Sequence, residues 1–246
     1  MPLTIDLSGR AVLVTGGTRG IGLGISEAFR AAGARVFTCS RSEVDSVDHY
    51  VCDVRDPEAV QALVAQVVAD AGRLDVLVNN AGGAPSVDAA TASPRFHDKI
   101  VALNLLSPLL VSQAANEVMQ QQEGGGSIVN ISSVAASRPA PTIAAYGAAK
   151  AGLDSLTMSL AMEWGPAVRV NAIDVGLCRT EQTDDHYGDD ARVAAIEGTI
   201  PLGRMARPEE VGNVAVFLAS DLASYVSGAR VACHGGGEPP VFLHIT

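Results

Sequence analysis

The sequence has no long apolar run. Its 246 residues are 48% hydrophobic, yet no stretch reaches the ~18 consecutive apolar residues that a membrane-spanning helix needs. Residues 1–10 also lack the basic flank and the apolar segment of a signal peptide. These absences predict a soluble, cytoplasmic protein. The apolar fraction is ample for one large buried core, which excludes a disordered or fibrous chain.

Paired cysteines and an excess of positive charge are missing as well. The four cysteines form no CxxC pair and have no histidines at metal-ligand spacing, so we expect reduced thiols, three of them packing residues, and no metal site: Cys39, Cys52, Cys178 and Cys233. The formal net charge of −10 produces a field that repels nucleic acid, anionic membranes and strongly acidic proteins. One anionic cofactor is still permitted, because its binding needs only local positive charge.

Short β-branched runs alternate with helix-length segments along the whole chain. This alternation predicts an α/β fold, a doubly wound seven-stranded parallel sheet of the Rossmann type. No linker divides the chain, so we expect a single domain over residues 1–246. Only residues 40–49 separate the second strand from the third, which predicts a stunted helix there. The predicted strands are 11–15, 36–39, 50–54, 74–79, 127–131, 168–173 and 229–232.

A glycine-rich segment follows the first predicted strand and precedes an amphipathic helix over 23–32. A strand, a glycine turn and a helix together direct free backbone N–H groups and the helix dipole at a pyrophosphate. The spacing is G-x3-G-x-G rather than GxGxxG, and a simple tight turn is the alternative interpretation. The candidate cofactor-binding residues of this loop are Gly16, Thr18, Arg19, Gly20, Ile21 and Gly22.

The end of the second strand predicts the kind of nicotinamide cofactor. An acidic residue at this position binds the ribose 2′-hydroxyl of NAD and repels the 2′-phosphate of NADP. Here the chain has no acid but offers Ser40 and Arg41, and Arg19 can approach the same phosphate. The pattern favours NADP(H). The alternative, that both arginines are ordinary surface charges, leaves the missing acid unexplained.

Two further strands end in polar or small residues where a parallel sheet forms its ligand crevice. Asp53 and Val54 close the third strand, and Asn80, Ala81 and Gly82 follow the fourth. We take all five as cofactor-binding candidates. Asp53 could instead cap a turn, and asparagines commonly begin a loop.

Tyr146 and Lys150 lie four residues apart on a predicted helix over 144–164, and therefore on one helix face. A phenol is a poor proton donor at neutral pH, and a nearby ammonium can lower its pKa. The pair is frequent by chance. Ser132 and Ser133 follow the fifth strand, where a hydroxyl could donate to a carbonyl oxygen that gains negative charge. A strand-end serine is otherwise only a cap or a turn former.

In combination these motifs resemble the classical short-chain dehydrogenase/reductase (SDR) family, from the glycine loop nearly to the C-terminus. The motifs occur in that family's order: TGGTRGIG (15–22), NNAG (79–82), ISS (131–133), YGAAK (146–150) and RVNA (169–172). The resemblance implies Ser133 rather than Ser132 as the catalytic serine, and Asn104 as the residue that holds a proton-relay water beside Lys150. It also implies cofactor contacts from Gly176 and Thr180, although Val175 replaces the family's proline.

The resemblance implies an oxidoreductase that transfers hydride between NADP(H) and a carbonyl or secondary alcohol. Tyr146 is then the general acid/base, Ser133 polarises the carbonyl, and Lys150 lowers the pKa of Tyr146 and binds the nicotinamide ribose. The alternatives are a 3-oxoacyl-(acyl carrier protein) reductase and a noncatalytic NADP-binding regulatory protein. Residues 119–123 and 162–165 offer no basic side chain for docking an acidic carrier, so a free small molecule is favoured. Loss of Tyr146 or Lys150 would indicate a noncatalytic protein, and neither is lost.

Three expectations concern the periphery. Residues 181–198 are taken as a substrate lid, and their acids disfavour anionic substrates. The apolar helices over 94–121 and 144–164, together with the apolar tail 239–245, suggest subunit contacts. By family resemblance the association is a homotetramer, with a dimer as the alternative.

Overall fold

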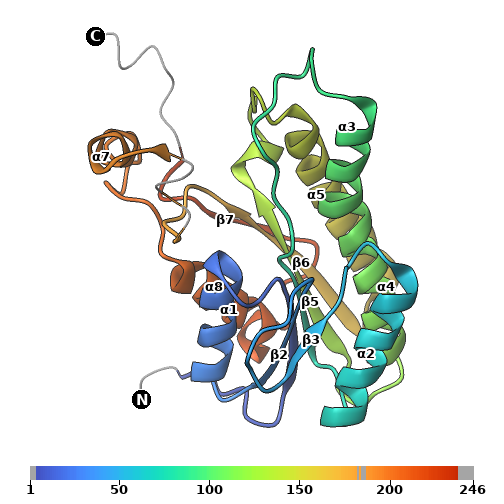
Figure 1. The fold of residues 1–246 in the computed structure, drawn as a ribbon. Coiled ribbons are helices and arrows are strands. Elements are labelled where there is room, and N and C mark those ends of the chain that lie inside the picture. Colours follow the sequence, from blue (N-terminus) through green and yellow to red (C-terminus); the bar gives the residue numbers. More distant parts are fainter. Residues whose placement is uncertain (1–3, 182, 184–186, 238–246) are drawn as a thin grey trace.

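The computed structural model describes residues 4–181, 183 and 187–237, and these form one seven-stranded parallel sheet with helices on both faces (Figure 1). The strand order is β3-β2-β1-β4-β5-β6-β7. The fold is therefore the predicted doubly wound, single-domain Rossmann type. The strands are β1 Ala11–Thr15, β2 Arg35–Ser40, β3 His49–Val51, β4 Val76–Asn79, β5 Gly126–Ser133, β6 Val168–Val175 and β7 Arg230–Cys233.

One face of the sheet is covered by α1 (Gly20–Ala31) and α8 (Pro208–Ala219). Ile25 and Phe29 of α1 pack with Val211 and Ala215 of α8 and with buried β-branched residues of the central strands. The two helices approach closely at Gly24, where a Cβ atom would lie 2.4 Å from the Pro208 side chain. Glycine at this position lets α8 lie directly against α1.

The other face is covered by α2 (Pro57–Ala71), α3 (Pro94–Val101), α4 (Ser107–Met119) and α5 (Ala144–Trp164). Its core combines α2, α4 and α5 side chains with the remaining faces of the strands. Helices α2 and α3 each begin with a proline and are capped by the side chain just before it: Asp56 accepts hydrogen bonds from two N–H groups of α2, and Ser93 accepts one from Phe96.

The connection between β2 and β3 differs from the prediction. Residues 41–48 are all described and form no helix, so the prediction of a short helix there was wrong. His49 helps to hold β3 against β2, because its ring nitrogens lie 2.9 Å from Thr38 Oγ1 and 3.3 Å from Ser40 Oγ. The strands still pair in parallel, with Thr38 opposite His49.

The predicted helix over 94–121 is interrupted. A π-helical segment, Ala102–Leu106, separates α3 from α4. Such widened turns occur preferentially at functional sites, and this one contains Asn104.

Strand ends also moved relative to the prediction. The third strand ends at Val51, so Asp53 and Val54 lie in the loop after it, and the fourth begins at Val76. The fifth and sixth strands extend to Ser133 and Val175, which pair with each other. A valine at position 175, unlike a proline, simply continues the strand.

Three of the four cysteines pack in the core, as expected: Cys39 and Cys52 on the α2 face, and Cys178 on the α8 face. Within the described part of the chain, no helix is long and apolar enough to cross a membrane. The apolar tail 239–245 lies outside the described residues, as do positions 182 and 184–186 of the expected lid.

Candidate active site

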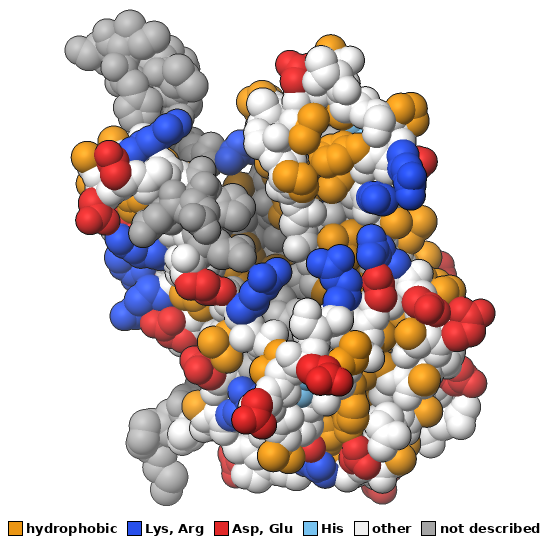
Figure 2. All heavy atoms as spheres, viewed as in Figure 1, with side chains coloured by type: hydrophobic (Ala, Val, Ile, Leu, Met, Phe, Trp, Pro, Cys, Tyr) orange, Lys and Arg blue, Asp and Glu red, His pale blue; other side chains and the backbone are white. Residues whose placement is uncertain are grey.

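The carboxyl ends of the strands meet at one end of the molecule. Figure 2 shows this face hollowed between the part that carries α7 (Asp190–Glu197) and the part that carries α3 and α5, with Lys and Arg side chains along the lower edge of the hollow. Most of the predicted site residues follow a strand that ends at this edge or lie near the start of a helix, whereas Asn104 lies in the π-helical segment between α3 and α4.

The glycine loop bends where the sequence predicts it. Gly16 has φ +64°, a left-handed conformation that glycine adopts without strain, and its N–H donates to the Cys39 carbonyl oxygen of β2. A Cβ at Gly22 would lie 2.1 Å from the Gly16 carbonyl oxygen, so no larger residue fits. Arg19 occupies the N-cap of α1 in an extended conformation without a side-chain cap. The N–H groups of the first helical turn are therefore left for an outside acceptor.

Asn80 supports this loop from the neighbouring strand β4. Its amide group donates to the carbonyl oxygens of Thr15 (2.9 Å) and Gly16 (3.1 Å). The backbone N–H groups of Asn80 and Ala81 both donate to Thr15 Oγ1 at 3.0 Å. The NNAG motif thus fixes the path of the glycine loop.

The end of β2 and the loop after β3 carry further residues predicted to bind the cofactor. Ser40 ends β2 with its hydroxyl donating to the Ser42 carbonyl oxygen (2.8 Å), and Arg41 is exposed beyond it. The Asp53 carboxylate accepts two side-chain hydrogen bonds from Arg55, at 2.9 and 2.6 Å. These bonds, with a contribution from Arg41, hold the pKa of Asp53 below its usual range.

Tyr146, Ser133 and Lys150 come together where β5 meets α5. Ser133 is the last residue of β5, and its hydroxyl hydrogen-bonds with Tyr146, which lies near the start of α5. One turn later, Lys150 Nζ lies 5.6 Å from the centre of the Tyr146 ring. Ser132 points elsewhere: its hydroxyl lies 3.5 Å from the Lys150 carbonyl oxygen. The structure therefore brings Ser133, not Ser132, to the phenol.

Burial governs the ionisation of this cluster. It raises the pKa of Tyr146, an effect that the Ser133 hydrogen bond opposes and that Tyr187 reinforces. It lowers the pKa of Lys150 to about 8, against the opposing charge of Asp154. Lys150 is only 4% exposed, and its one hydrogen bond to a described residue goes to the Ile131 carbonyl oxygen, 2.8 Å away. The ammonium thus retains donors for a further ligand.

Asn104 is fully buried in the π-helical segment. Its Oδ1 accepts from the Gly83 N–H (2.8 Å), and its amide donates to the carbonyl oxygens of Gly83 (3.0 Å) and Ile100 (2.9 Å). A Cβ at Gly82 would lie 2.8 Å from Asn104 Oδ1 and 3.4 Å from Lys150 Nζ. Asn104 and Lys150 therefore both reach the space beside Gly82, and the family resemblance implies the same neighbourhood.

The segment after β6 reaches the glycine loop from the opposite side. A Cβ at Gly20 would lie 3.5 Å from Thr180 Cγ2 and 3.9 Å from Glu181 Oε1. Gly176 packs against His234 after β7. Thr180, for which the resemblance implies a cofactor contact, thus lies beside the glycine loop, as does the Glu181 carboxylate of the expected lid.

Comparison with known proteins gives the family. The sequence model of a family described as "Enoyl-(Acyl carrier protein) reductase" matches residues 16–238. A 2-dehydro-3-deoxy-D-gluconate 5-dehydrogenase of Pseudoalteromonas atlantica is 37% identical, over 94% of this chain and 96% of its own. A D-threitol dehydrogenase of Mycolicibacterium smegmatis is 38% identical, over 94% and 93%. The chain belongs to the short-chain dehydrogenase/reductase family.

A solved SDR structure agrees with the fold. A protein from Beutenbergia cavernae, described as a candidate NAD(P)-dependent gluconate 5-dehydrogenase with NADP bound at low occupancy, superposes with a TM-score of 0.87 at 36% identity. The match covers 95% of this chain and 98% of that one. The relatives include dehydrogenases and a reductase, and the chain is an oxidoreductase of the SDR family, whose members use nicotinamide cofactors.

Several residues of this SDR site were missed by the sequence reasoning. Arg55 could have been noticed two residues after Asp53, but His49 gave no signal until β2 and β3 were paired. The buried acids Asp154 and Asp174, with Arg230, lie behind Lys150 and come from three different elements. Nothing in their spacing indicates that they meet.

Proposed function

We propose that this protein is an NADP(H)-dependent SDR that interconverts a carbonyl and a secondary alcohol, with Tyr146 as its general acid/base. The observation that carries the proposal is the convergence of the Tyr146 phenol, the Ser133 hydroxyl and the Lys150 ammonium at the end of β5. A regulatory protein that only binds the cofactor has no use for this convergence.

The site fits a dinucleotide at two places. The first turn of α1 has no side-chain cap and no acidic residue, whereas α2 is capped by Asp56. The free N–H groups and the helix dipole there suit a pyrophosphate. Lys150, with ammonium hydrogens to spare, and Asn104 nearby suit the nicotinamide ribose end. When bound, NADPH would supply the hydride.

The chain's own residues then manage the oxygen of the substrate. The Ser133 hydroxyl donates to the carbonyl oxygen and stabilises the negative charge that develops on it. Tyr146 delivers its phenolic proton to that oxygen, or removes the proton in the reverse direction. Lys150 keeps positive charge beside the phenol and so opposes the rise in its pKa caused by burial. We further propose that Asn104, on its π-helical turn, holds the water that returns a proton to Lys150.

NADP(H) is favoured over NAD(H) by charge at the end of β2. Ser40 ends the strand, the next residue is Arg41 rather than an acid, and both Arg41 and Arg19 are exposed. A guanidinium forms paired, charge-assisted hydrogen bonds to a phosphate. The bound NADP in the relative from Beutenbergia cavernae supports this choice.

The substrate is proposed to be a free small ketone or secondary alcohol. Relatives act on substrates as different as a sugar acid and a tetritol by their names, so the family leaves the choice open. Residues 181–198 form the proposed lid, and their acids, including Glu181 beside the glycine loop, disfavour anionic substrates. Homo-oligomerisation remains our expectation.

The test is oxidation of NADPH or NADH by the purified protein across a panel of neutral ketones, polyol-derived ketones and 3-oxoacyl thioesters. We expect turnover of at least one neutral ketone, with higher kcat/KM for NADPH. Turnover of thioesters alone would support the carrier-protein alternative. A preference for NADH would contradict the role given to Arg41, and NADPH binding without turnover of any substrate would support a regulatory protein.

A further inference from the structure

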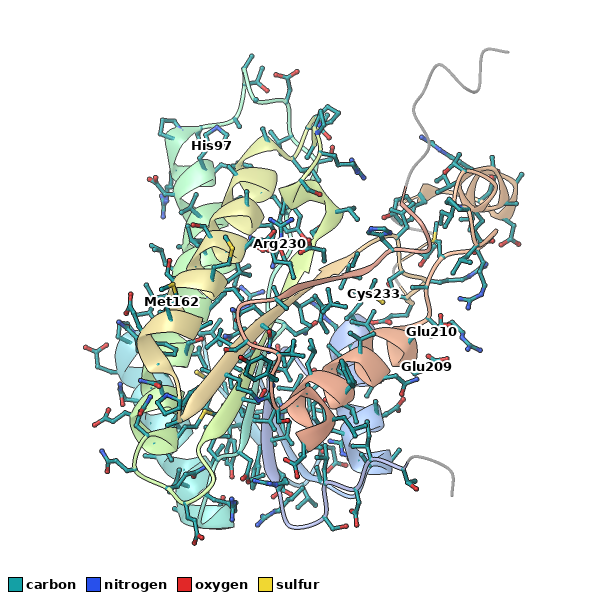
Figure 3. All side chains as sticks on the ribbon, turned by 180° about the vertical axis from the view of Figure 1, so that it is seen from behind. His97, Met162, Glu209, Glu210, Arg230 and Cys233 are labelled. Atoms are coloured by element: carbon teal, nitrogen blue, oxygen red, sulfur yellow. The ribbon has the colours of Figure 1, made fainter. Side chains whose placement is uncertain are left out.

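A cluster of charged side chains that the mechanism above does not use begins one helical turn after Lys150. Asp154 follows Lys150 by one turn on α5, Asp174 comes from β6 and Arg230 from β7. Figure 3 shows Arg230 from behind the molecule, where β7 passes α5. Its guanidinium lies 3.6 Å from Asp154 Oδ2 and 3.7 Å from Asp174 Oδ2.

The two carboxylates are almost completely buried, Asp154 at 2% exposure and Asp174 at 7%. Neither oxygen of Asp154 has a hydrogen bond of ordinary geometry to a described residue, and Asp174 Oδ1 has none either. The Ser132 hydroxyl is near enough to lower the pKa of both acids, and the two carboxyl groups interact with each other. A buried carboxylate without such bonds is costly, because it loses hydration and receives little in return. If the acids served only to pair with Arg230, one carboxylate would be enough. Burying one carboxylate costs less free energy than burying two.

The position of Asp154 suggests what the second acid does. Residues at i and i+4 on a helix are neighbours, about 5–6 Å apart at Cβ, so Asp154 is the acid next to the Lys150 side chain. In so dry an environment an ammonium tends to give up its proton. The charge of Asp154 raises the pKa of Lys150 and so opposes this tendency, whereas the charge of Asp174 changes the pKa of Asp154.

We propose that Asp154 is a positioning residue of the active site, whose buried carboxylate keeps the proton on Lys150, with Arg230 keeping Asp154 ionised. Burial raises the pKa of Asp154, and Asp174 raises it further, so both oppose this arrangement, whereas the Ser132 hydroxyl and Arg230 lower the pKa of Asp154 and support it. The inference rests on the proposed function of Lys150, but its physical content, the charge on one ammonium, can be measured without any reaction. The ionisable groups around the pair are Tyr146 on α5, Tyr187 facing that phenol, Asp174, Arg230, and His234 after β7.

The sequence makes the measurement unusually clean. Only two of the 17 basic residues are lysines, Lys99 and Lys150. Protein labelled with 13C-lysine therefore gives two side-chain Cε signals, one from the exposed Lys99 of α3 and one from Lys150. The ligand-free protein is titrated by NMR, with the Lys99 signal as the internal reference.

We expect the Lys150 signal of the wild type to titrate near pH 8. In Asp154→Asn the midpoint falls by about one pH unit, the size of a nearby opposite charge. Asp174→Asn is the matched control, an identical substitution in the same buried cluster, and it leaves the Lys150 midpoint unchanged or raises it. If asparagine is not tolerated at position 154, Asp154→Ser serves the same measurement.

An unchanged Lys150 midpoint in a folded Asp154 variant would overturn the inference and leave Asp154 as a tie between α5 and β7. Equal falls in both variants would overturn it too, since general disturbance of the cluster would then explain them. The proposed function is tested separately by the pH profile of kcat/KM: its alkaline limb moves to lower pH in Asp154→Asn by the same amount. A shifted NMR midpoint with an unshifted profile would uphold the electrostatics and contradict the catalytic role of Lys150.

Discussion

Tyr146 in the ligand-free protein is a weaker acid than free tyrosine, because its surroundings penalise the phenolate. Lowering the pKa of a phenol by about three units requires about 4 kcal/mol of differential stabilisation. Ser133 supplies a hydrogen bond, and Lys150 with a positively charged oxidised nicotinamide would supply the rest. We therefore expect the phenol to become reactive only when the cofactor is bound.

Arg41 is the residue that should separate the two cofactors. Arg41→Ala removes a guanidinium at the end of β2, so we expect the Kd for NADPH to rise about 10-fold or more and the Kd for NADH to stay nearly constant. Fluorescence titration of the reduced cofactors measures both. Arg30→Ala, at the exposed end of α1, is the control. Equal weakening of both cofactors would show that Arg41 does not contact the 2′-phosphate.

At this scale the sequence predicts residues that share a local motif. Tyr146 and Lys150 are adjacent on one helix turn, and Ser133 follows from the family spacing. The partners of Lys150 on the other side could not be predicted, because Asp174 and Arg230 reach Asp154 only after β6 and β7 have paired. An aspartate within an apolar helix gives no indication of its neighbours.

At the level of elements, the glycine loop depends on β4. Asn80→Ala would remove two hydrogen bonds to the loop backbone and leave the Thr15 and Gly16 carbonyl oxygens unsatisfied. We expect the Kd for NADPH to rise about 30-fold, since the two lost bonds cost about 2 kcal/mol together. Calorimetric titration measures it.

The control for Asn80 is Asn116→Ala on α4, which removes only a surface bond to Gln120 and should leave cofactor affinity unaltered. Unaltered affinity in Asn80→Ala as well would mean that the loop keeps its path without β4.

Two elements escaped prediction for physical reasons. The π-helical segment widens one turn without ending the helix, and its residues ALNLL carry no glycine or proline that would mark an interruption. It is recognisable only because Asn104 turns inward to Gly83. No helix forms between β2 and β3, because the connection is too short to contain a helix. The contacts of His49 with Thr38 and Ser40 hold these two strands together instead.

At the scale of the whole molecule, Asp75 links the amino ends of β1 and β4, because it precedes β4 and accepts a hydrogen bond from the first residue of β1. Burial pushes its pKa up, but hydrogen bonds from Arg73, the Ala11 N–H and Arg10 outweigh burial and leave the pKa lowered. A lowered folded-state pKa stabilises the protein above the unfolded value of about 3.9, and this stability is lost as the pH falls through the folded value.

Asp75→Asn should therefore lower the free energy of unfolding by about 2 kcal/mol at pH 7, and the difference from wild type should shrink at acid pH. Urea unfolding at pH 7 and in a pH series below 5 measures both effects. The exposed Asp45→Asn variant is the control. A pH-independent difference would show that lost packing, not charge, explains the result.

Association of subunits is the remaining expectation at this scale. Met162, near the end of α5, is 88% exposed and Met158 is 47% exposed on the same helix. If α5 lies in a subunit interface, Met162→Glu shifts the mass measured by light scattering to a smaller species. Glu117→Gln is the control, because it changes an exposed residue of α4 without introducing a charge. An unchanged mass in Met162→Glu would remove this part of α5 from the interface.

The sheet itself follows from the sequence because its strands are short, apolar and regularly separated by helices. The sequence predicts the class of sheet but not the order of its strands. A strand end is predicted too early where polar residues continue the hydrogen bonding between strands, as Ser132 and Ser133 do in β5. The apolar alternation that identifies a strand stops before the hydrogen bonding does.

The central claim is that Tyr146 moves the proton that accompanies hydride transfer. Its most direct test is single-turnover oxidation of NADPH by Tyr146→Phe and by wild type, with a ketone that the wild type reduces. The account predicts that Tyr146→Phe still binds NADPH but reduces the ketone at least 100-fold more slowly. A rate equal to that of the wild type would contradict it.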